Sequence, residues 1–492
     1  MIDTICRELE SGTNIRGQLI ALKQEIKDEQ ELNQWRAYHR KYPVLYGYLS
    51  HEDPKVRKNA AVILGQTEGN AAVSALYEAY EKEQTLFVRS AYLDAMMNLD
   101  VTGYIDAFRE QAKRLIDTTP AEEEKKHIYA EIHGLLQLIR KFDGDRHHKF
   151  TGYDIPVELL LTTTPNYQKL TLAQLPRGTA KAVKAGVLVR TEQLRQVIAI
   201  RTFRELLFVL QGNHHISGSP QQIAGEILAT NLLELLDRIH EGEFPYSFRL
   251  DVKGTISSDK RAQLIHRVAE QLEQQSGYRL FNAPDNYELE IRLMINEDES
   301  IHPILKLFTI PMRRFSYRKQ AVAASIHPAT AALLMQLAKP YLKEGAQVLD
   351  PFCGVGTMLI ERDMLVPAGD MYGTDIFGEA ILKARENAQA AGRSVNYINR
   401  DFFDFTHKYL FDEVVTNMPV RGKKTKEQQD QFYSDFFHRI GQFLKPGSIM
   451  VLYTNEMGFV KKQLRLHREF SMVQEYLIRK KDEFYLYVIR IG

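Results

Sequence analysis

Four hydrogen-bond-accepting side chains follow short apolar segments in the C-terminal third of the chain. They are Asp350, Asp375, Asp401 and Asn417, and the second stands 375 − 350 = 25 positions after the first. Each apolar segment reads as a buried strand, and the carboxyl ends of parallel strands meet at one edge of a sheet, where open α/β folds bind ligands. We therefore expect these side chains on one rim. For any single aspartate, capping of the following helix is an alternative.

The segment VLDPFCGVGTMLIE, Val348 to Glu361, predicts a strand, a glycine-rich turn and a helix. Gly354 and Gly356 permit a tight turn and a close approach to a ligand, and a helix beginning near Thr357 directs free N–H groups at it. The spacing is neither GxGxxG nor a GK[ST] ending, which disfavours NAD and ATP. A carboxylate inside the loop, Asp350, suits a cationic amino-acid ligand. S-adenosylmethionine, with its ammonium, ribose and adenine, fits these features.

The predicted roles follow the order of the strands. Asp350 and the glycines would hold the methionine part of S-adenosylmethionine, Asp375 the ribose hydroxyls, and Asp401 the adenine amino group. The full predicted cofactor set is Asp350, Phe352, Gly354, Gly356, Thr357, Asp375, Ile376, Asp401 and Phe402.

The elements that must position these residues alternate strand and helix. Strands are expected at Gln347–Leu349, Met371–Thr374, Val395–Ile398, Glu413–Thr416 and Ser448–Tyr453. Two further strands, Phe470–Ile478 and Glu483–Ile491, are joined by a short charged turn and predict a terminal antiparallel hairpin. Such a hairpin distinguishes a methyltransferase sheet from a dinucleotide-binding sheet.

With these motifs, residues from about Arg313 to Gly492 resemble class I S-adenosylmethionine-dependent methyltransferases. More narrowly, they resemble the RNA N2-guanine methyltransferases that carry a THUMP RNA-binding domain. The resemblance rests on RRFSYRKQAVAASIHPATAALLMQLA, DPFCGVGTMLIE, GTDIFGEAI, NRDFFDF and TNMPVRGKK. It implies a Rossmann-like seven-stranded α/β fold and methyl transfer to an exocyclic amino group in structured RNA, guanine N2 of tRNA or rRNA first.

The TNMPV block departs from the family pattern of Asn or Asp, two prolines and an aromatic residue. The resemblance implies that Asn417 and the Met418 carbonyl accept hydrogen bonds from the target amino group, with Pro419 completing the catalytic block. Val420 replaces the aromatic residue that stacks on the base, a contact worth about 1–3 kcal/mol. Phe402, Phe403 or Tyr433 could replace that ring, or the site could be retired.

Composition narrows the class of protein. A chain of 492 residues with 44% hydrophobic content predicts about three domains with ample cores. The acidic start MIDTICRELESG and the lack of a long apolar run predict no signal segment and no membrane association. Two cysteines favour a reducing, cytoplasmic location over a disulfide or metal framework. Cys353 could be a nucleophile, but its place in the ligand loop favours a buried filler.

Basic residues are clustered although the net charge is only +1. Each cluster alone fits a solvated face, whereas a shared rim would suit a phosphate backbone. The predicted RNA-binding residues are Arg314, Arg318, Arg421, Lys423 and Lys424. The histidine pairs His147–His148 and His214–His215 lack accompanying cysteines and cannot share one helix face, so no metal site is expected.

The N-terminal residues, 1–145, carry a repeat. VRKNAAVIL at Val56 recurs as VRSAYLDAM at Val88, an offset of 88 − 56 = 32. A period near 32 with paired helices predicts an α-solenoid resembling HEAT repeats. Its surface could bind a protein partner, or it could be an architectural platform within the chain.

The middle region, 150–305, alternates strand and helix and follows a polar linker, Lys141–Asp154. VELLLTTT, VLVRT and ELLFVLQ resemble the ferredoxin-like unit that precedes THUMP domains. YSFRLDVKG, a helix from Ser258 to Gly277, and YELEIRLMIN resemble the THUMP core, which implies RNA binding. The third predicted domain, 310–492, is the methyltransferase domain.

Three function classes stay open at this point. The first is methylation of structured RNA. The second is a catalytically retired protein that binds RNA or a ribosomal particle and recruits a partner through its solenoid. The third is methylation of a protein or small molecule, which the cofactor residues alone do not exclude.

Overall fold

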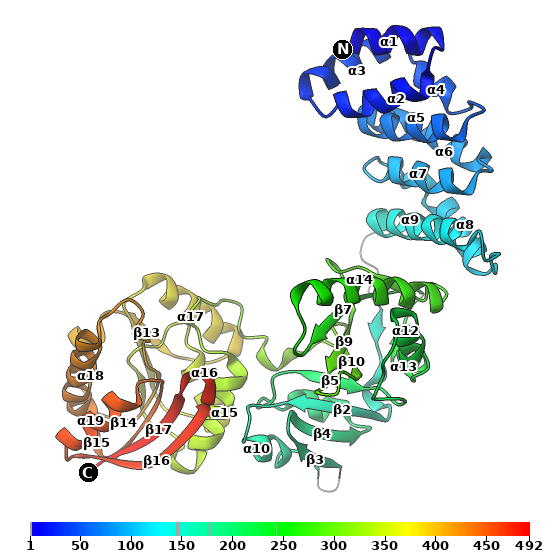
Figure 1. Cartoon of the computed structure of the whole chain (residues 1–492). Coiled ribbons are helices and arrows are strands. Elements are labelled where there is room, and N and C mark those ends of the chain that lie inside the picture. Colours follow the sequence, from blue (N-terminus) through cyan, green and yellow to red (C-terminus); the bar gives the residue numbers. More distant parts are fainter. Residues whose placement is uncertain (1, 144–147, 177–178, 243) are drawn as a thin grey trace. The chain divides into compact units, whose positions relative to one another are not determined.

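The computed structural model describes residues 2–143, 148–176, 179–242 and 244–492 (Figure 1). They form two compact units, Met1–His148 with Glu270–Phe281, and Lys149–Ala269 with Asn282–Gly492. The predicted middle and C-terminal domains thus lie mostly in one unit. The division at 145, 150–305 and 310–492 stays a prediction, and its first boundary, with His147, lies outside the described residues.

The first unit is built from paired helices. They are α1 (Ile2–Ser11), α2 (Ile15–Glu25), α3 (Glu29–Lys41), α4 (Val44–Tyr48), α5 (Pro54–Thr67), α6 (Val73–Lys82), α7 (Leu86–Met96), α8 (Ile105–Ile116) and α9 (Lys125–Asp143). Helix α7 packs against α5, α6 and α9. The HEAT-like assignment of these helices stays a prediction.

The 32-residue offset has a structural counterpart in two arginines, Arg57 in α5 and Arg89 in α7. Arg57 pairs with buried Glu83 at 2.7 Å, and Arg89 pairs with buried Glu131 at 2.8 Å. Each arginine also donates hydrogen bonds to two backbone carbonyls, those of residues 51 and 52 for Arg57 and of residues 80 and 83 for Arg89. The two arginines thus make the same kinds of contact 32 residues apart, although their glutamate partners lie 131 − 83 = 48 positions apart.

A mixed sheet follows the first helices along the chain. Its elements are β1 (Lys149–Phe150), β2 (Val157–Thr162), α10 (Gln168–Leu172), β3 (Ala180–Val183), β4 (Gly186–Thr191), α11 (Leu194–Ala199), β5 (Leu206–Val209), α12 (Pro220–Leu228), α13 (Leu232–Ile239), β6 (His240–Glu241), β7 (Tyr246–Lys253), α14 (Ser258–Gln275), β8 (Leu280–Asn282), β9 (Leu289–Ile295) and β10 (Ile301–Leu307). Most of these elements belong to the second unit, while the end of α14 and most of β8 fall within Glu270–Phe281 of the first unit. The strand order is β3-β4-β2-β5-β10-β9-β7-β8. Strand β10 pairs antiparallel with both β5 and β9, so the two predicted strand–helix groups share one sheet.

The C-terminal sheet has the order β13-β12-β11-β14-β15-β17-β16. Its elements are α15 (Pro328–Ala338), β11 (Val348–Asp350), α16 (Thr357–Leu365), β12 (Met371–Asp375), α17 (Gly378–Ala391), β13 (Asn396–Asn399), β14 (Phe411–Asn417), α18 (Lys426–Ile440), β15 (Leu444–Thr454), α19 (Met457–Leu466), β16 (Phe470–Arg479) and β17 (Phe484–Ile491). The first five strands are parallel, and β17 is antiparallel to both neighbours. The expected Rossmann-like sheet with its terminal hairpin is confirmed.

This sheet is covered on both faces, because its strands are apolar on both sides. Neighbouring residues Val451 and Leu452 of β15 belong to two different core clusters. One cluster includes Leu334 of α15 and Leu359 of α16, and the other includes Phe436 of α18. The polar rim is left at the strand ends.

A buried ion pair ties α16 to β14 inside this core. Arg362 and Glu413 are both 2% exposed or less, and two N–O distances between them are 2.8 Å. Glu413 also accepts a hydrogen bond from the Lys343 backbone N–H at 2.6 Å. The helix after the glycine loop and the strand that ends at Asn417 are therefore held in one register.

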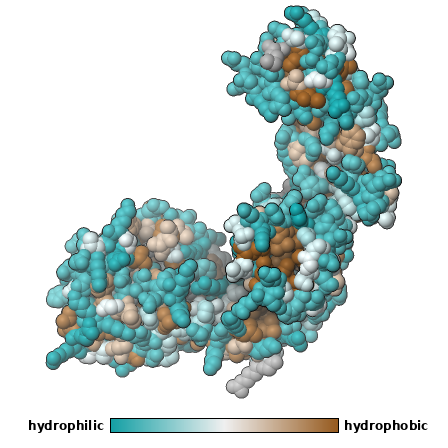
Figure 2. Space-filling view, in the orientation of Figure 1, coloured by the Kyte–Doolittle hydropathy of each residue, from teal (hydrophilic) through white to brown (hydrophobic). Residues whose placement is uncertain are grey.

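The visible surface is mostly hydrophilic, with apolar atoms gathered over the middle region (Figure 2). None of the helices in the described part of the chain is both long and apolar enough to span a membrane.

Candidate functional site

Each predicted aspartate accepts a hydrogen bond from the backbone N–H two residues ahead of it. The pairs are Asp350–Phe352 at 3.1 Å, Asp375–Phe377 at 2.9 Å and Asp401–Phe403 at 3.0 Å. This local turn orients each carboxylate as it leaves its strand. Asp401 is the N-cap of the short helical turn Phe402–Asp404, whereas α16 and α17 have Gly356 and Phe377 as N-caps. The capping alternative therefore holds for Asp401 and not for Asp350 or Asp375, and the second carboxylate oxygen of each residue decides what else it can bind.

The Asp350 carboxyl is 1% exposed at the end of β11. Its Oδ2 atom has no hydrogen-bond partner within the described residues. Burial raises the pKa of Asp350 to about 7, and the nearby Thr416 hydroxyl and the Phe352 N–H oppose that rise. A buried carboxyl with an open acceptor suits a cationic ligand, because an opposite charge compensates the lost hydration.

Asp375 connects the end of β12 to the glycine loop, since its Oδ2 accepts a hydrogen bond from the Gly354 N–H at 2.9 Å. Both loop glycines have left-handed backbone, with φ of 52° at Gly354 and 82° at Gly356. A Cβ at Gly356 would lie 2.1 Å from the Tyr397 hydroxyl oxygen, whereas one at Gly354 would meet nothing within 4 Å. Gly356 is thus required for packing, and Gly354 borders open space where a ligand can approach.

The two residues after Asp375 are apolar and exposed. Ile376 is 59% exposed and Phe377 is 66% exposed. Two adjacent exposed apolar side chains at this rim offer a surface that a flat heterocycle would cover. Sequence reasoning included Ile376 and missed Phe377, although its place directly beyond a strand-end acid was a usable signal.

The Phe402 side chain lies in the core and not at the rim, so a cofactor contact by this residue would have to come from its backbone, and its predicted cofactor-binding role stays a prediction. It is 1% exposed, and its ring lies 5.8 Å from that of Phe352 and 5.9 Å from that of Phe436. Burying this ring in an aromatic cluster is more favourable than leaving it at the surface. Phe352 is half-buried, and Thr357 is the buried first residue of α16. Asp401 is exposed at the end of β13.

The Asn417–Pro419 block is held by its backbone. The Met418 N–H donates to the Tyr453 carbonyl at 2.9 Å, and the Pro419 carbonyl accepts from Gln429 Nε2 at 3.3 Å. The Asn417 side chain and the Met418 carbonyl make no hydrogen bond within the described residues. Two acceptors are thus presented together at the end of β14.

The side chains around this block clarify its departure from the family pattern. Met418 is 1% exposed, so its side chain is a core residue. Val420 is 54% exposed at the position of the usual aromatic residue. Tyr433 is fully buried and its hydroxyl bonds Thr454 at 2.6 Å, so neither it nor Phe402 can stack on a base. Of the three suggested rings, half-buried Phe403 is left.

Arg314 is not available to RNA, contrary to prediction. Its guanidinium donates to the carbonyls of Ile200, Phe203 and Arg204 at 2.8 to 2.9 Å and lies 3.5 Å from the Phe203 ring centroid. Burial lowers its pKa to about 10. These partners lie more than 100 residues earlier in the chain, so no local pattern revealed them.

Arg318 also lies away from a free surface. Its Nη1 donates to the Ile326 carbonyl and, at 3.3 Å, to Thr357 Oγ1 at the start of α16. By contrast, Arg421, Lys423 and Lys424 are exposed in the loop that follows Pro419. Lys424 Nζ lies 4.4 Å from the Phe432 ring centroid. Of the predicted RNA-binding residues, these three are therefore the ones exposed next to the Asn417 block.

Residues 315–483 match the family of RMKL-like methyltransferase domains. A tRNA (guanine(6)-N2)-methyltransferase of Thermus thermophilus is 27% identical over 210 residues, which cover 41% of this chain and 60% of that protein. A bovine U6 snRNA (guanine-N(2))-methyltransferase, THUMPD2, is 25% identical over 290 residues, covering 56% and 53%. The chain thus spans little more than half the length of these two relatives.

Two solved structures share the fold of 68% of this chain. TrmN from Thermus thermophilus superposes with a TM-score of 0.52 at 22% identity, over 68% of this chain and 100% of that chain. SMU.472, solved in complex with SAH, gives a TM-score of 0.53 at 14% identity, over 68% and 98%. At these identities the similarity establishes the shared fold.

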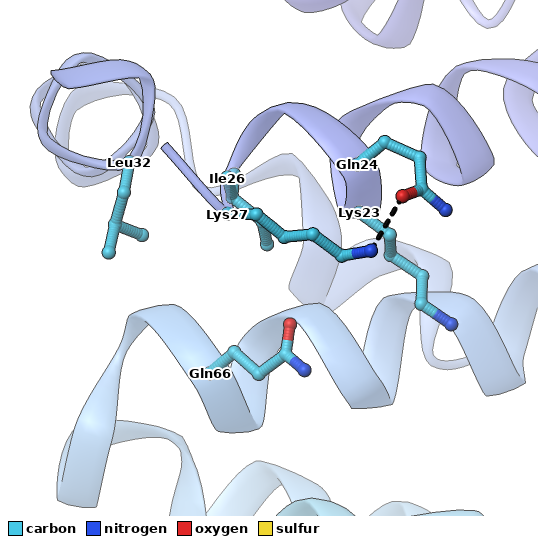
Figure 3. A pocket seen from close by; sticks show the side chains of 6 residues that line it. All are labelled: Lys23, Gln24, Ile26, Lys27, Leu32 and Gln66. Atoms are coloured by element: carbon cyan, nitrogen blue, oxygen red, sulfur yellow. Dashed lines mark hydrogen bonds between the residues drawn. The ribbon is translucent and has the colours of Figure 1, made fainter. Parts of the chain in front are cut away.

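A separate pocket of about 370 Å³ lies in the first unit, among α2, α3 and α5 (Figure 3). It is lined by Lys23, Gln24, Ile26, Lys27, Leu32 and Gln66. Lys27 Nζ donates to Gln24 Oε1 at 2.7 Å. The lining offers ammonium and amide groups but no carboxylate, thiol or imidazole, and it shares no residue with the methyltransferase site.

His147 lies outside the described residues, and among the residues that are described no group of three His, Cys, Asp or Glu side chains could hold a metal ion. The His214 ring stacks on His302 at 4.6 Å. Both cysteines, Cys6 and Cys353, are free and buried.

Proposed function

We propose that the methyltransferase domain transfers a methyl group from S-adenosylmethionine to an exocyclic amino group in structured RNA, with guanine N2 as the target. The observation that supports this best is the pair of acceptors at the end of β14. The Met418 N–H is bonded to the Tyr453 carbonyl and the Pro419 carbonyl to the Gln429 side chain, while the Asn417 side chain and the Met418 carbonyl are left to bind a ligand. An amino group has two N–H donors, which matches two acceptors.

The residues at the ends of the parallel strands have features that suit S-adenosylmethionine. The open Oδ2 of Asp350 suits the ammonium, and Gly354 borders the space beside it. Asp375 can accept further hydrogen bonds from ribose hydroxyls, since each carboxylate oxygen has two acceptor sites. Exposed Ile376 and Phe377 would contact the adenine ring, with Asp401 near its amino group.

When bound, the cofactor supplies an electrophilic methyl group on a sulfonium. Asn417 Oδ1 and the Met418 carbonyl oxygen would each accept one N–H of the target amino group. These hydrogen bonds orient the nitrogen and direct its lone pair away from the ring plane, toward the methyl group. After transfer the nitrogen is cationic and loses a proton readily to water, so no strong general base is required.

Structured RNA is the substrate class that the surroundings favour. Arg421, Lys423 and Lys424 are exposed beside the Asn417 block, where phosphates of a bound RNA would lie. The relatives named above act on tRNA and U6 snRNA. The middle region, as a THUMP-like part, would bind the same RNA, and the helices of the first unit would offer a surface to a protein partner. Free, reduced cysteines suit a cytoplasmic location.

A second candidate function, a retired methyltransferase that binds RNA, is favoured by one observation. Val420 leaves the base-stacking position without a ring, and burial removes Tyr433 and Phe402 as replacements. Losing one stacking contact costs about 1–3 kcal/mol, or about ten- to a hundredfold in rate, which weakens an enzyme without abolishing it. Catalysis is therefore the stronger proposal.

The test is transfer of labelled methyl from S-adenosylmethionine to total RNA from cells that lack the protein, followed by digestion to nucleosides. N2-methylguanosine as the labelled product in one RNA species would support the proposal. Label in another nucleoside would show that the protein is a methyltransferase but that guanine N2 is not the atom it methylates. No transfer, with cofactor binding still measurable, would favour the retired protein.

A further inference from the structure

Arg318 is a half-buried cation that forms no direct ion pair within the described residues. Its Nη1 donates to the Ile326 carbonyl and to Thr357 Oγ1 at 3.3 Å. Burial lowers its pKa, and the nearby Tyr317 and Glu361 oppose this shift only in part. A guanidinium partly removed from water is ordinarily compensated by a carboxylate or phosphate. Its position therefore suits an anion supplied by a ligand.

Two helix N-termini meet at Arg318. Thr357 is the first residue of α16, and Ile326 directly precedes His327, the N-cap of α15. The N-cap of α16 is Gly356, so no side chain accepts hydrogen bonds from the first N–H groups of that helix. Free N–H groups and the positive end of the helix dipole both favour an anion at this place.

The same loop carries a complementary group at its other end. Asp350 begins the loop that ends at Thr357, and its Oδ2 is buried without a partner. Gly354, between them, borders open space. A carboxyl at one end of this loop and a guanidinium that donates a hydrogen bond to its other end fit a ligand that carries an ammonium and a carboxylate together, as an amino acid does.

We infer that Arg318, together with the N-terminus of α16, binds the α-carboxylate of the methionine part of S-adenosylmethionine. This inference rests on the proposed function for the identity of the cofactor. It gives Arg318 a cofactor-binding role in place of the RNA-binding role expected from its sequence cluster.

The experiment is a calorimetric binding titration of the full chain with two ligands. One is S-adenosylmethionine, and the other is decarboxylated S-adenosylmethionine, which lacks only the carboxylate. Each ligand is titrated into wild type, Arg318→Met, Arg318→Lys and Arg313→Met. Arg313 is an exposed neighbour and serves as the matched control. Circular dichroism of each variant verifies folding, and Arg318→Lys keeps the positive charge with less disturbance.

Wild type should bind S-adenosylmethionine about 10- to 100-fold more tightly than the decarboxylated ligand, the range for a hydrogen bond to a charged group. Arg318→Met should lose this preference by weakening only the carboxylate-bearing ligand, Arg318→Lys should keep part of it, and Arg313→Met should keep all of it. Equal weakening of both ligands would make Arg318 structural and overturn the inference. Unchanged affinity for S-adenosylmethionine, or no preference in wild type, would overturn it as well.

This outcome is independent of methyl transfer. Wild type that shows the carboxylate preference but transfers no methyl group would contradict the proposed function and leave the inference standing. Reduced RNA affinity in Arg318→Met, with S-adenosylmethionine binding unchanged, would overturn the inference and show that Arg318 binds RNA, as the sequence predicted.

Discussion

Arg201 and Glu361 form a two-pronged ion pair that joins the loop after α11 to helix α16. The two N–O distances are 2.9 and 2.6 Å, and Glu361 is 2% exposed. Glu361 also accepts a hydrogen bond from the Tyr317 hydroxyl at 2.6 Å, and Arg201 donates to the Arg314 carbonyl. One turn after its start at the glycine loop, α16 is thus fixed to the middle region.

Arg201→Ala should destabilise the second unit by about 3 kcal/mol, because it leaves the Glu361 carboxylate buried without its cation. Urea denaturation followed by circular dichroism measures this change. The matched control is Arg190→Ala, which removes a pair with Glu158 at 3.1 Å whose arginine side chain is 80% exposed, and it should cost less than about 1 kcal/mol. Similar decreases in the free energy of unfolding for both variants would show that the pair with Glu361 stabilises the protein no more than the pair with Glu158 does. Fluorescence of Trp35, the sole tryptophan, reports the first unit and should not change.

Cofactor affinity should fall as the pH falls below 7. The pKa of Asp350 is raised to about 7 by burial, so below this pH the free protein holds a proton there. Binding an ammonium requires the carboxylate, and releasing the proton costs affinity, up to about tenfold per pH unit below the pKa. Titrations of S-adenosylmethionine from pH 5.5 to 7 measure this slope. Asp350→Asn should bind weakly with a flat profile, and a flat profile in wild type would rule out this role.

Gln429 should act as a positioning residue for the catalytic block. Its Nε2 donates to the Pro419 carbonyl at 3.3 Å, and the residue is fully buried in the first turns of α18. Gln429→Leu should lower kcat up to about tenfold, the upper range for one neutral hydrogen bond, while cofactor affinity is retained. Gln431→Leu, at an exposed position of the same helix, is the control. A parallel loss of cofactor binding would indicate general damage to the domain instead.

Val420→Phe should increase activity. Val420 is 54% exposed where related enzymes carry an aromatic ring, and a new stacking contact is worth about 1–3 kcal/mol. We expect kcat/KM for RNA to rise about tenfold or more. Leu466→Phe adds a ring at another exposed apolar position, in α19, and should have no effect. If Val420→Phe is neutral or harmful, the base is held in another way.

The methyltransferase sheet could be predicted because its strands are short apolar runs bounded by glycines and acids. Strand β10 could not, since Pro303 interrupts its pattern and its pairing with β5 joins residues about 100 positions apart. Pro303 sits opposite Leu293 in the sheet. Non-local pairing of this kind leaves no local signal, and it is what unites the two parts of the middle region.

The candidate site likewise contains residues whose positions could be predicted from the sequence and residues whose contacts could not. Strand-end position located Asp350, Asp375 and Asn417, because sheet geometry fixes where such residues lie. The basic sequence cluster wrongly predicted that Arg314 binds RNA. Its guanidinium donates instead to three backbone carbonyls that only tertiary packing brings near it. The contact of Gln429 could not be predicted for the same reason, since only the folded chain places this side chain beside Pro419.

The central claim is that Asn417 orients the amino group that receives the methyl. The most direct measurement is methyl transfer from labelled S-adenosylmethionine to RNA by wild type and Asn417→Ala, with the cofactor affinity of both proteins measured alongside. We predict labelled RNA with wild type, a loss of at least about a hundredfold in the variant, and equal cofactor affinity. Undiminished transfer by Asn417→Ala would contradict the claim, and so would a loss of transfer that merely follows a loss of cofactor binding.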